Sequence, residues 1–313
     1  MSRRTPRLFA AALAVGALLL GGCAEKTAND TPAAGGSGSA AAAFPVSVGR
    51  LTLEKRPEKI VSLSPSTTEM LFAIGAGKQV TAVDDQSNYP AEAPKSDLSG
   101  FQPNAEAIAA KAPDLVVLAN DLNKIVDQLT TLKIPVLLTP AATTLDDTYQ
   151  QLTDLGKLTG HPAEADAVTK KMKDDIAALT KDLPQRAKKL TYYHELGPEL
   201  YSATSKTFIG SIYTLAGLEN IADPADADGK SAGYPQLSQE VIVKANPDFV
   251  FLADTKCCKQ TPETVKARSG WAGVTAVKNN QIVGLDDDVA SRWGPRVVDL
   301  LKAIIDATAK VPA

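Results

Sequence analysis

Short apolar runs divide the chain into strands separated by helical stretches. Eight such runs read as strands, and those at residues 114–119 and 248–253 are apolar at nearly every position, as in strands buried on both faces. The eight runs cover residues 59–64, 79–84, 114–119 and 134–139 in the first half, and 190–195, 219–222, 248–253 and 281–285 in the second. Apolar residues also alternate between positions 46 and 53 around Gly49-Arg50, which indicates a hairpin. Each half is therefore expected to be a mostly parallel sheet covered by helices.

One segment of the chain recurs 134 positions later. Residues 104–119 and 238–253 are identical at seven of sixteen positions, namely Glu, Ile, Pro, Asp, Val, Leu and Ala. Each copy begins with a helix N-cap residue, Asn104 or Ser238, and continues through a short helix and a proline into a buried strand. Two copies at matching places predict two similar lobes.

A long helix is expected between the lobes, over residues 159–184. Pro162 suits the first turn of a helix. The apolar stripe along this helix consists of Val168, Met172, Ile176, Leu179 and Leu183. The lobes then cover residues 44–158 and 185–313, and a stiff connection between them would limit hinge motion. A second stripe, Val298, Leu301 and Ile305, predicts a last helix that begins at Pro295.

The N-terminal segment is typical of an exported protein. Three arginines precede a 13-residue apolar run, residues 8–20, which is too short to span a bilayer but suits a signal peptide. The run ends in Leu20-Gly21-Gly22-Cys23, which resembles the lipobox of bacterial lipoproteins. Residues 1–22 would then be removed, Cys23 lipidated, and residues 23–43 left as an Ala, Gly and Ser-rich tether. The alternative is an ordinary secretory signal with a chance cysteine.

The net charge of the chain without residues 1–22 bears on whether nucleic acid is a partner. Without residues 1–22, the 30 basic residues stand against 36 acidic ones, a net charge of about −6. This mildly acidic chain is not expected to bind nucleic acid.

Motifs for catalysis are incomplete in this sequence. His194-Glu195 begins like a zinc-protease motif, but Pro198 occupies the position of the second histidine. Gly229-Lys230-Ser231 is similar to the end of a phosphate-binding loop, but Pro224 replaces the leading glycine. With two histidines and two adjacent cysteines after Cys23, we expect no catalytic residues, no protein-built metal site and no cofactor.

Three motifs resemble one family. Residues 59–69, Ala216-Gly217-Leu-Glu-Asn220-Ile221 and the Asn-Pro-Asp before residue 249 are similar to class III solute-binding proteins of ABC importers. The resemblance covers residues 44–310. It implies two Rossmann-like α/β lobes joined by a single long helix, with the ligand cleft between the lobes. The family binds vitamin B12, ferric siderophores and haem.

The resemblance also implies a place and a set of partners. The protein would be a monomer, lipid-anchored at the extracytoplasmic face of the cell membrane. It would capture a metal-complex ligand and deliver it to an ABC permease dimer with its ATPase subunits. A corrinoid is the leading ligand, with a ferric siderophore or haem as the alternative. The remote alternative to a binding protein is an enzyme or a structural lipoprotein.

Ligands of open α/β sheets bind beyond the carboxyl ends of the strands. Aromatic faces suit a flat macrocycle, and the aromatic residues in or beside loops near those ends are Tyr89, Phe101, Tyr193, Tyr201, Tyr234, Trp271 and Trp293. The candidate ligand contacts among them are Tyr89, Phe101, Tyr193, Tyr234 and Trp293. Individually, each could equally fill a core or the surface.

Asp288 and Arg292 lie in a segment that resembles the one with which B12-binding members contact the corrinoid. The alternative is a helix-capping acid and a solvated ion pair. Gln86 departs from the B12-binding pattern, which has a tyrosine there, and the aromatic residue before Asn104 is displaced to Phe101.

Glu106 and Glu240 occupy matching places in the repeat, two residues after each N-cap. A carboxylate there gains about 0.3–1 kcal/mol from the helix dipole, which alone accounts for its presence. In the family these acids pair with arginines of the two permease subunits, so the resemblance implies a docking role.

Cys257 and Cys258 are adjacent, in a loop after the strand at residues 248–253. An oxidising compartment favours a strained vicinal disulfide between them. Two free thiols, inert or bound to a metal, are the alternative.

Overall fold

Two four-stranded parallel sheets form the framework of residues 43–312, the residues that this computed structural model describes. The expected signal peptide, Cys23 and residues 23–42 of the expected tether lie outside the described residues. Lobe one has the strand order β4-β3-β5-β6, and lobe two has the order β10-β9-β7-β8. The strands are β3 Ile60–Leu63, β4 Val80–Val83, β5 Leu115–Leu118, β6 Val136–Leu138, β7 Thr191–Glu195, β8 Glu219–Asn220, β9 Phe249–Leu252 and β10 Ile282–Gly284.

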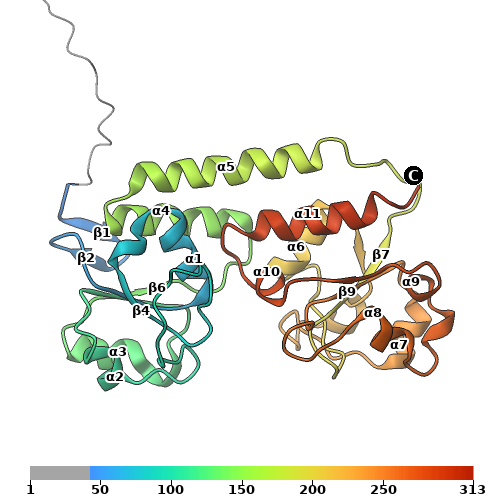
Figure 1. Cartoon of the computed structure of the whole chain (residues 1–313), viewed down its shortest axis with the longest axis horizontal. Helices are drawn as coiled ribbons and strands as arrows, with labels where there is room; N and C mark the ends of the chain where they lie inside the picture. Colours follow the sequence, from blue (N-terminus) through green and yellow to red (C-terminus); the bar gives the residue numbers. More distant parts are fainter. Residues whose placement is uncertain (1–42, 313) are drawn as a thin grey trace, which may run out of the picture. The chain divides into compact units, whose positions relative to one another are not determined.

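All eight strands were predicted, and a hairpin of β1 (Val46–Val48) and β2 (Leu51–Leu53) precedes them as expected. Helices cover the sheets (Figure 1). In lobe one they are α1 Pro65–Ala73, α2 Ala105–Ala109, α3 Ile125–Thr131 and α4 Leu145–Thr159. After α5, Pro162–Thr180, they are α6 Phe208–Leu215, α7 Gln239–Ala245, α8 Pro262–Lys266, α9 Thr275–Lys278, α10 Asp287–Ser291 and α11 Val297–Thr308.

The repeated aspartate has the same structural role in both lobes. Asp114 Oδ2 accepts hydrogen bonds from the backbone N–H groups of Glu58 and Lys59, just before β3. Asp248 Oδ2 accepts from the backbone N–H and the hydroxyl of Thr191, the first residue of β7. The repeat therefore ties the start of one strand to the start of its neighbour in each lobe.

Helix α5 joins the lobes, packing on α4 of lobe one and on α11 of lobe two (Figure 1). Met172 and Ile176 of the predicted stripe are buried, and Val168 and Leu179 pack on the same core. The helix ends at Thr180, so Leu183 lies outside it.

The last helix differs from its prediction in phase. Its fully buried side consists of Val297, Leu300, Leu301 and Ile304, whereas Val298 and Ile305 are only partly buried. The helix contacts α5, α6 and α10, so it buries a wider face than a single stripe of three residues could cover.

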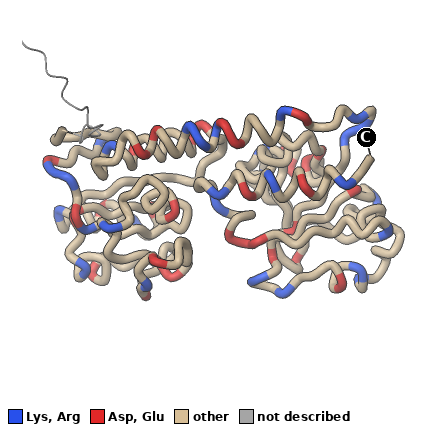
Figure 2. The backbone as a smooth tube through the Cα atoms, turned by 45° about the horizontal axis from the view of Figure 1, so that its top comes forward, with Lys and Arg blue, Asp and Glu red and all other residues tan. Residues whose placement is uncertain are grey.

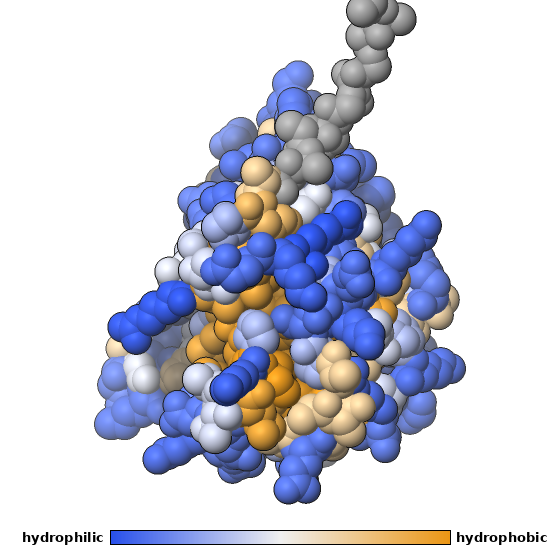
Figure 3. Space-filling view, turned by 90° about the vertical axis from the view of Figure 1, so that its left-hand side faces the viewer, coloured by the Kyte–Doolittle hydropathy of each residue, from blue (hydrophilic) through white to orange (hydrophobic). Residues whose placement is uncertain are grey.

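Charged residues are spread over both lobes, with acidic and basic positions interspersed (Figure 2). Apolar side chains reach the surface on the outer side of lobe one (Figure 3). A groove in this lobe runs beside the hairpin and β6, lined by Leu51, Val126, Ile134, Pro135 and Val136 among others. Within residues 43–312, every helix is too short or too polar to cross a membrane.

Candidate functional site

A buried ion-pair network joins the two lobes at the carboxyl ends of their sheets. Glu69 lies on α1 of lobe one and is only 2 % exposed. Its Oε1 accepts a hydrogen bond from Arg292 Nη1 at 2.7 Å, and its Oε2 accepts from Arg296 Nε at 2.9 Å. Both arginines follow β10 of lobe two, so we call residues 286–296 together with Glu69 the interlobe seam.

Asp288 extends the seam. Its Oδ1 accepts from Arg292 Nη2 at 2.8 Å, and its Oδ2 accepts from Lys256 Nζ at 2.8 Å and from Asn88 Nδ2 at 3.1 Å. Burial opposes ionisation of this carboxyl group, but the hydrogen bond from Lys256 and the charge of Arg292 prevail and lower the pKa of Asp288. Asp288 therefore carries a stable negative charge where the loop after β4 meets α10.

Arg292 does not point into open space. Besides Glu69 and Asp288, its Nη2 donates to the backbone carbonyl of Gln86 at 3.0 Å. The guanidinium is buried, and two of its hydrogen bonds go to lobe one, to Glu69 and to Gln86. Three of the five guanidinium N–H groups already bind protein acceptors, so Arg292 takes part in the contact between the lobes, and its contact with a ligand stays a prediction.

Three of the predicted aromatic residues are exposed: Tyr89 beside the seam, Tyr234 on lobe two and Phe101 on lobe one. Tyr89 is 46 % exposed, and the Arg296 guanidinium lies 4.1 Å from its ring centroid. Tyr234 is 44 % exposed and follows a tight turn of residues 229–233. Phe101, in the loop before α2, is exposed as well.

Sequence reasoning did not select Tyr201, although this residue is as exposed as Tyr234. Tyr201 forms an antiparallel bridge with Gln236, which brings its loop beside the loop of Tyr234. The two rings belong to loops that follow β7 and precede α7. The sequence placed Tyr201 near these strand ends, but nothing in it showed that this ring, unlike that of Tyr193, is exposed.

The prediction that Tyr193 faces a ligand is wrong. Tyr193 is fully buried in the core of lobe two, where its ring packs edge-on against Trp271. Trp293 is half-buried, because its indole Nε1 donates to Gln151 Oε1 of α4 at 3.0 Å and its backbone is held by Ser66 and Thr148. It joins the lobes more than it lines an open face.

The adjacent cysteines lie next to the seam. Their Sγ atoms are 2.6 Å apart, and no disulfide bond is drawn between them in this structure. Burial, with the neighbouring Cys258 and Asp287, raises the pKa of Cys257 to about 12. The backbone N–H of Cys257 donates to Asp287 Oδ2 at 2.9 Å. The disulfide stays a prediction.

Glu106 and Glu240 are both exposed, in the first turns of α2 and α7. The predicted N-caps are present: Asn104 accepts from Ala107 N–H, and Ser238 accepts from Val241 N–H. Helices α2 and α7 lie on the same side of the two lobes, away from α5 (Figure 1). Neither acid is paired with a basic side chain of the described residues.

The two histidines have separate structural partners. His161 contacts Arg56 and Gln79, and His194 is buried against Tyr213. In the part of the chain that the structure describes, no three His, Cys, Asp or Glu side chains are placed to hold a metal ion.

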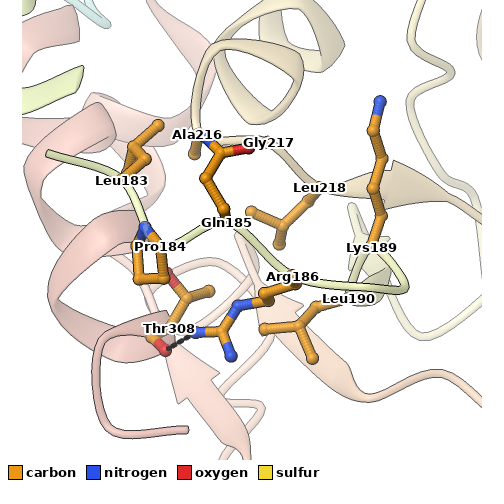
Figure 4. Close-up of a pocket in the computed structure, with 10 residues that line it drawn as sticks. All are labelled: Leu183, Pro184, Gln185, Arg186, Lys189, Leu190, Ala216, Gly217, Leu218 and Thr308. Carbon is orange, nitrogen blue, oxygen red and sulfur yellow. Dashed lines mark hydrogen bonds between the residues drawn. The ribbon is translucent and has the colours of Figure 1, made fainter. Parts of the chain in front are cut away.

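A cavity of about 210 Å³ lies at the other end of lobe two (Figure 4). It is lined by Leu183, Leu190, Leu218 and their neighbours, next to the first residue of β7. Arg186 is held by the carbonyl groups of Thr308 and Val311. Because this cavity is at the amino end of the sheet, it is not where an α/β fold places its ligand.

The chain is similar to known proteins over most of its length. It is 29% identical, over 95% of both chains, to an uncharacterized ABC transporter substrate-binding lipoprotein of Bacillus subtilis, YvrC. It is 33% identical to a cobalamin-binding protein of Halobacterium salinarum, over 82% of this chain and 71% of that one. The apo structure of the periplasmic heme-binding protein RhuT from Roseiflexus sp. RS-1 superimposes with a TM-score of 0.69, at 25% identity, over 80% and 98% of the two chains.

The sequence profile of the family described as periplasmic binding protein matches residues 60–289. The match covers the strands of both sheets and ends at Val289, inside the interlobe seam. The chain belongs to the periplasmic binding protein family.

Proposed function

We propose that this protein is the lipid-anchored substrate-binding protein of an ABC importer and that it captures a corrinoid between its lobes. The observation that carries the proposal is the 33% identity with a protein named cobalamin-binding, extending over 82% of the chain. The ligand would lie at the carboxyl ends of both sheets, where Tyr89, Tyr201 and Tyr234 expose their rings. Binding without chemical change is the role, rather than catalysis.

Delivery to a permease is the second part of the proposal. Glu106 and Glu240 are exposed acids of α2 and α7, two helices that lie on the same side of the two lobes (Figure 1). A permease dimer with one basic patch on each subunit would match this pair, and charge complementarity would set the orientation of docking. Cys23 would hold the protein at the extracytoplasmic face of the membrane.

Haem is the second candidate ligand, because the structure of a heme-binding protein superimposes over nearly all of its length. A flat tetrapyrrole could stack on the same exposed tyrosines. The two ligands are distinguished by binding experiments with cyanocobalamin and haemin in parallel.

Uptake of radiolabelled cyanocobalamin by cells that depend on this protein tests delivery. The double variant Glu106→Ala, Glu240→Ala is expected to abolish uptake while its affinity for the ligand changes less than a few-fold. The matched control is Glu164→Ala, Glu263→Ala, which removes exposed first-turn acids from α5 and α8. Normal uptake by the first double variant would refute the docking role.

A further inference from the structure

The face of the lobe-two sheet that carries Tyr193 holds two buried carboxyl groups and one guanidinium. Glu195 ends β7, and Asp254 follows β9 by two residues. Both side chains are fully buried. The strands are neighbours, and the backbone N–H of Ala253 donates to the carbonyl of Glu195 at 2.9 Å, which brings the two acids to the same end of the sheet.

Arg268 neutralises only one of these acids. Its Nη1 donates to Glu195 Oε2 at 2.6 Å, and its Nη2 donates to Glu195 Oε1 at 2.5 Å. Neither carboxyl oxygen of Asp254 accepts a hydrogen bond from any group in the described residues. An isolated buried carboxylate is costly and is usually protonated instead.

We propose that Asp254 is a buried proton-binding site. Its carboxyl group holds one proton near neutral pH and donates a hydrogen bond to Glu195. The geometry favours this arrangement because two carboxylates beside one guanidinium leave an unbalanced negative charge, which a single proton removes. The ionisable groups that act on Asp254 are Glu195 and Tyr193 of β7 and Arg268, which follows α8. Burial, followed by the charge of Glu195, raises the pKa of Asp254 to about 7.

The proton would control the loop of residues 254–260. The carbonyl of Asp254 accepts hydrogen bonds from the backbone N–H groups of Cys258 and Gln260 at 3.2 and 3.3 Å. Gln260 Oε1 also accepts from Arg268 Nη2 at 2.9 Å. When Asp254 loses its proton to solvent, its carboxylate competes with Glu195 and Gln260 for Arg268, and we expect the loop to loosen.

This loop leads directly to the interlobe seam. Lys256 Nζ bonds Asp286 and Asp288, and the N–H of Cys257 bonds Asp287. Loss of one proton inside lobe two would therefore be transmitted to the adjacent cysteines and to the contacts between the lobes. The result is a pH-sensitive element that responds near neutrality.

Infrared difference spectroscopy of the full chain in detergent tests the proton directly. The carbonyl stretch of a protonated carboxylic acid should be present at about pH 6, decrease towards about pH 8, and be missing in Asp254→Asn. Absence of that band from the unmodified protein at about pH 6, or its persistence in Asp254→Asn, would overturn the proposal. The first of these outcomes is measured on the unmodified protein, so it does not depend on whether the variant folds.

Hydrogen exchange tests the loop. After correction for the intrinsic pH dependence of exchange, protection of residues 254–260 should fall several-fold between about pH 6 and pH 8 in the unmodified protein. It should stay constant in Asp254→Asn, which keeps a neutral donor for Glu195. The matched control Asp228→Asn, at an exposed acid, should behave like the unmodified protein. Equal pH responses in Asp254→Asn and in the unmodified protein would contradict the coupling.

Discussion

Arg292 of lobe two and Glu69 of lobe one form a buried ion pair, with 2.7 Å between Nη1 and Oε1. Arg296 binds the same carboxylate, so Glu69 pairs with two arginines of the other lobe, and Asp288 is a second acid partner of Arg292. The lobes are therefore connected twice, by α5 on one side and by this network on the other.

Replacing Glu69 with Gln should destabilise the protein by roughly 3 kcal/mol, because Arg296 would lose its carboxylate partner and Arg292 would keep only Asp288. Urea unfolding followed by circular dichroism measures this change. The control is Asp174→Asn, which breaks the exposed Lys170–Asp174 pair on α5 and should cost less than about 1 kcal/mol. Equal effects of the two substitutions would show that the network contributes little.

His194 should make the protein sensitive to acid. Burial lowers the pKa of His194 to about 4, below its ordinary value of 6.5, so the folded state keeps the ring neutral. Its contribution to stability is complete above about pH 6.5 and is lost as the pH falls towards about 4, by about 1.4 kcal/mol per pH unit. Proton NMR of the imidazole signals, assigned with His161→Asn, measures the titration. A titration of His194 near pH 6.5 would contradict this prediction.

Cys257 and Cys258 should form a vicinal disulfide in the exported protein. Intact mass of never-reduced protein should be about 2 Da lower than after reduction. Reaction of both residues with iodoacetamide before any reductant is added would instead establish two thiols.

Closure of the lobes on ligand binding should be small, because α5 and the interlobe seam both hold them. Small-angle scattering curves of the protein with and without cyanocobalamin should nearly superimpose. A clear decrease in the radius of gyration on binding would require the seam to rearrange.

The strands were predictable because most of them are short runs dominated by apolar residues, such as β5 and β9, and the two lobes were predictable because one segment repeats. Side-chain partners were not. Nothing in the sequence near Arg292 indicates that its main partner is Glu69, 223 positions away. Tyr193 lies in a strand buried on both faces, where an alternating pattern cannot show which residues reach a ligand.

The most direct measurement is calorimetric titration of the purified protein with cyanocobalamin, with absorbance spectra before and after. One corrinoid should bind per chain and be recovered unchanged, and Tyr234→Ala should weaken binding by about 1–3 kcal/mol. Leu132→Ala, which removes an exposed apolar side chain just after α3, should leave the affinity unchanged. No binding of cyanocobalamin, with tight binding of haemin instead, would contradict the proposed ligand, and chemical turnover of either would contradict a binding role.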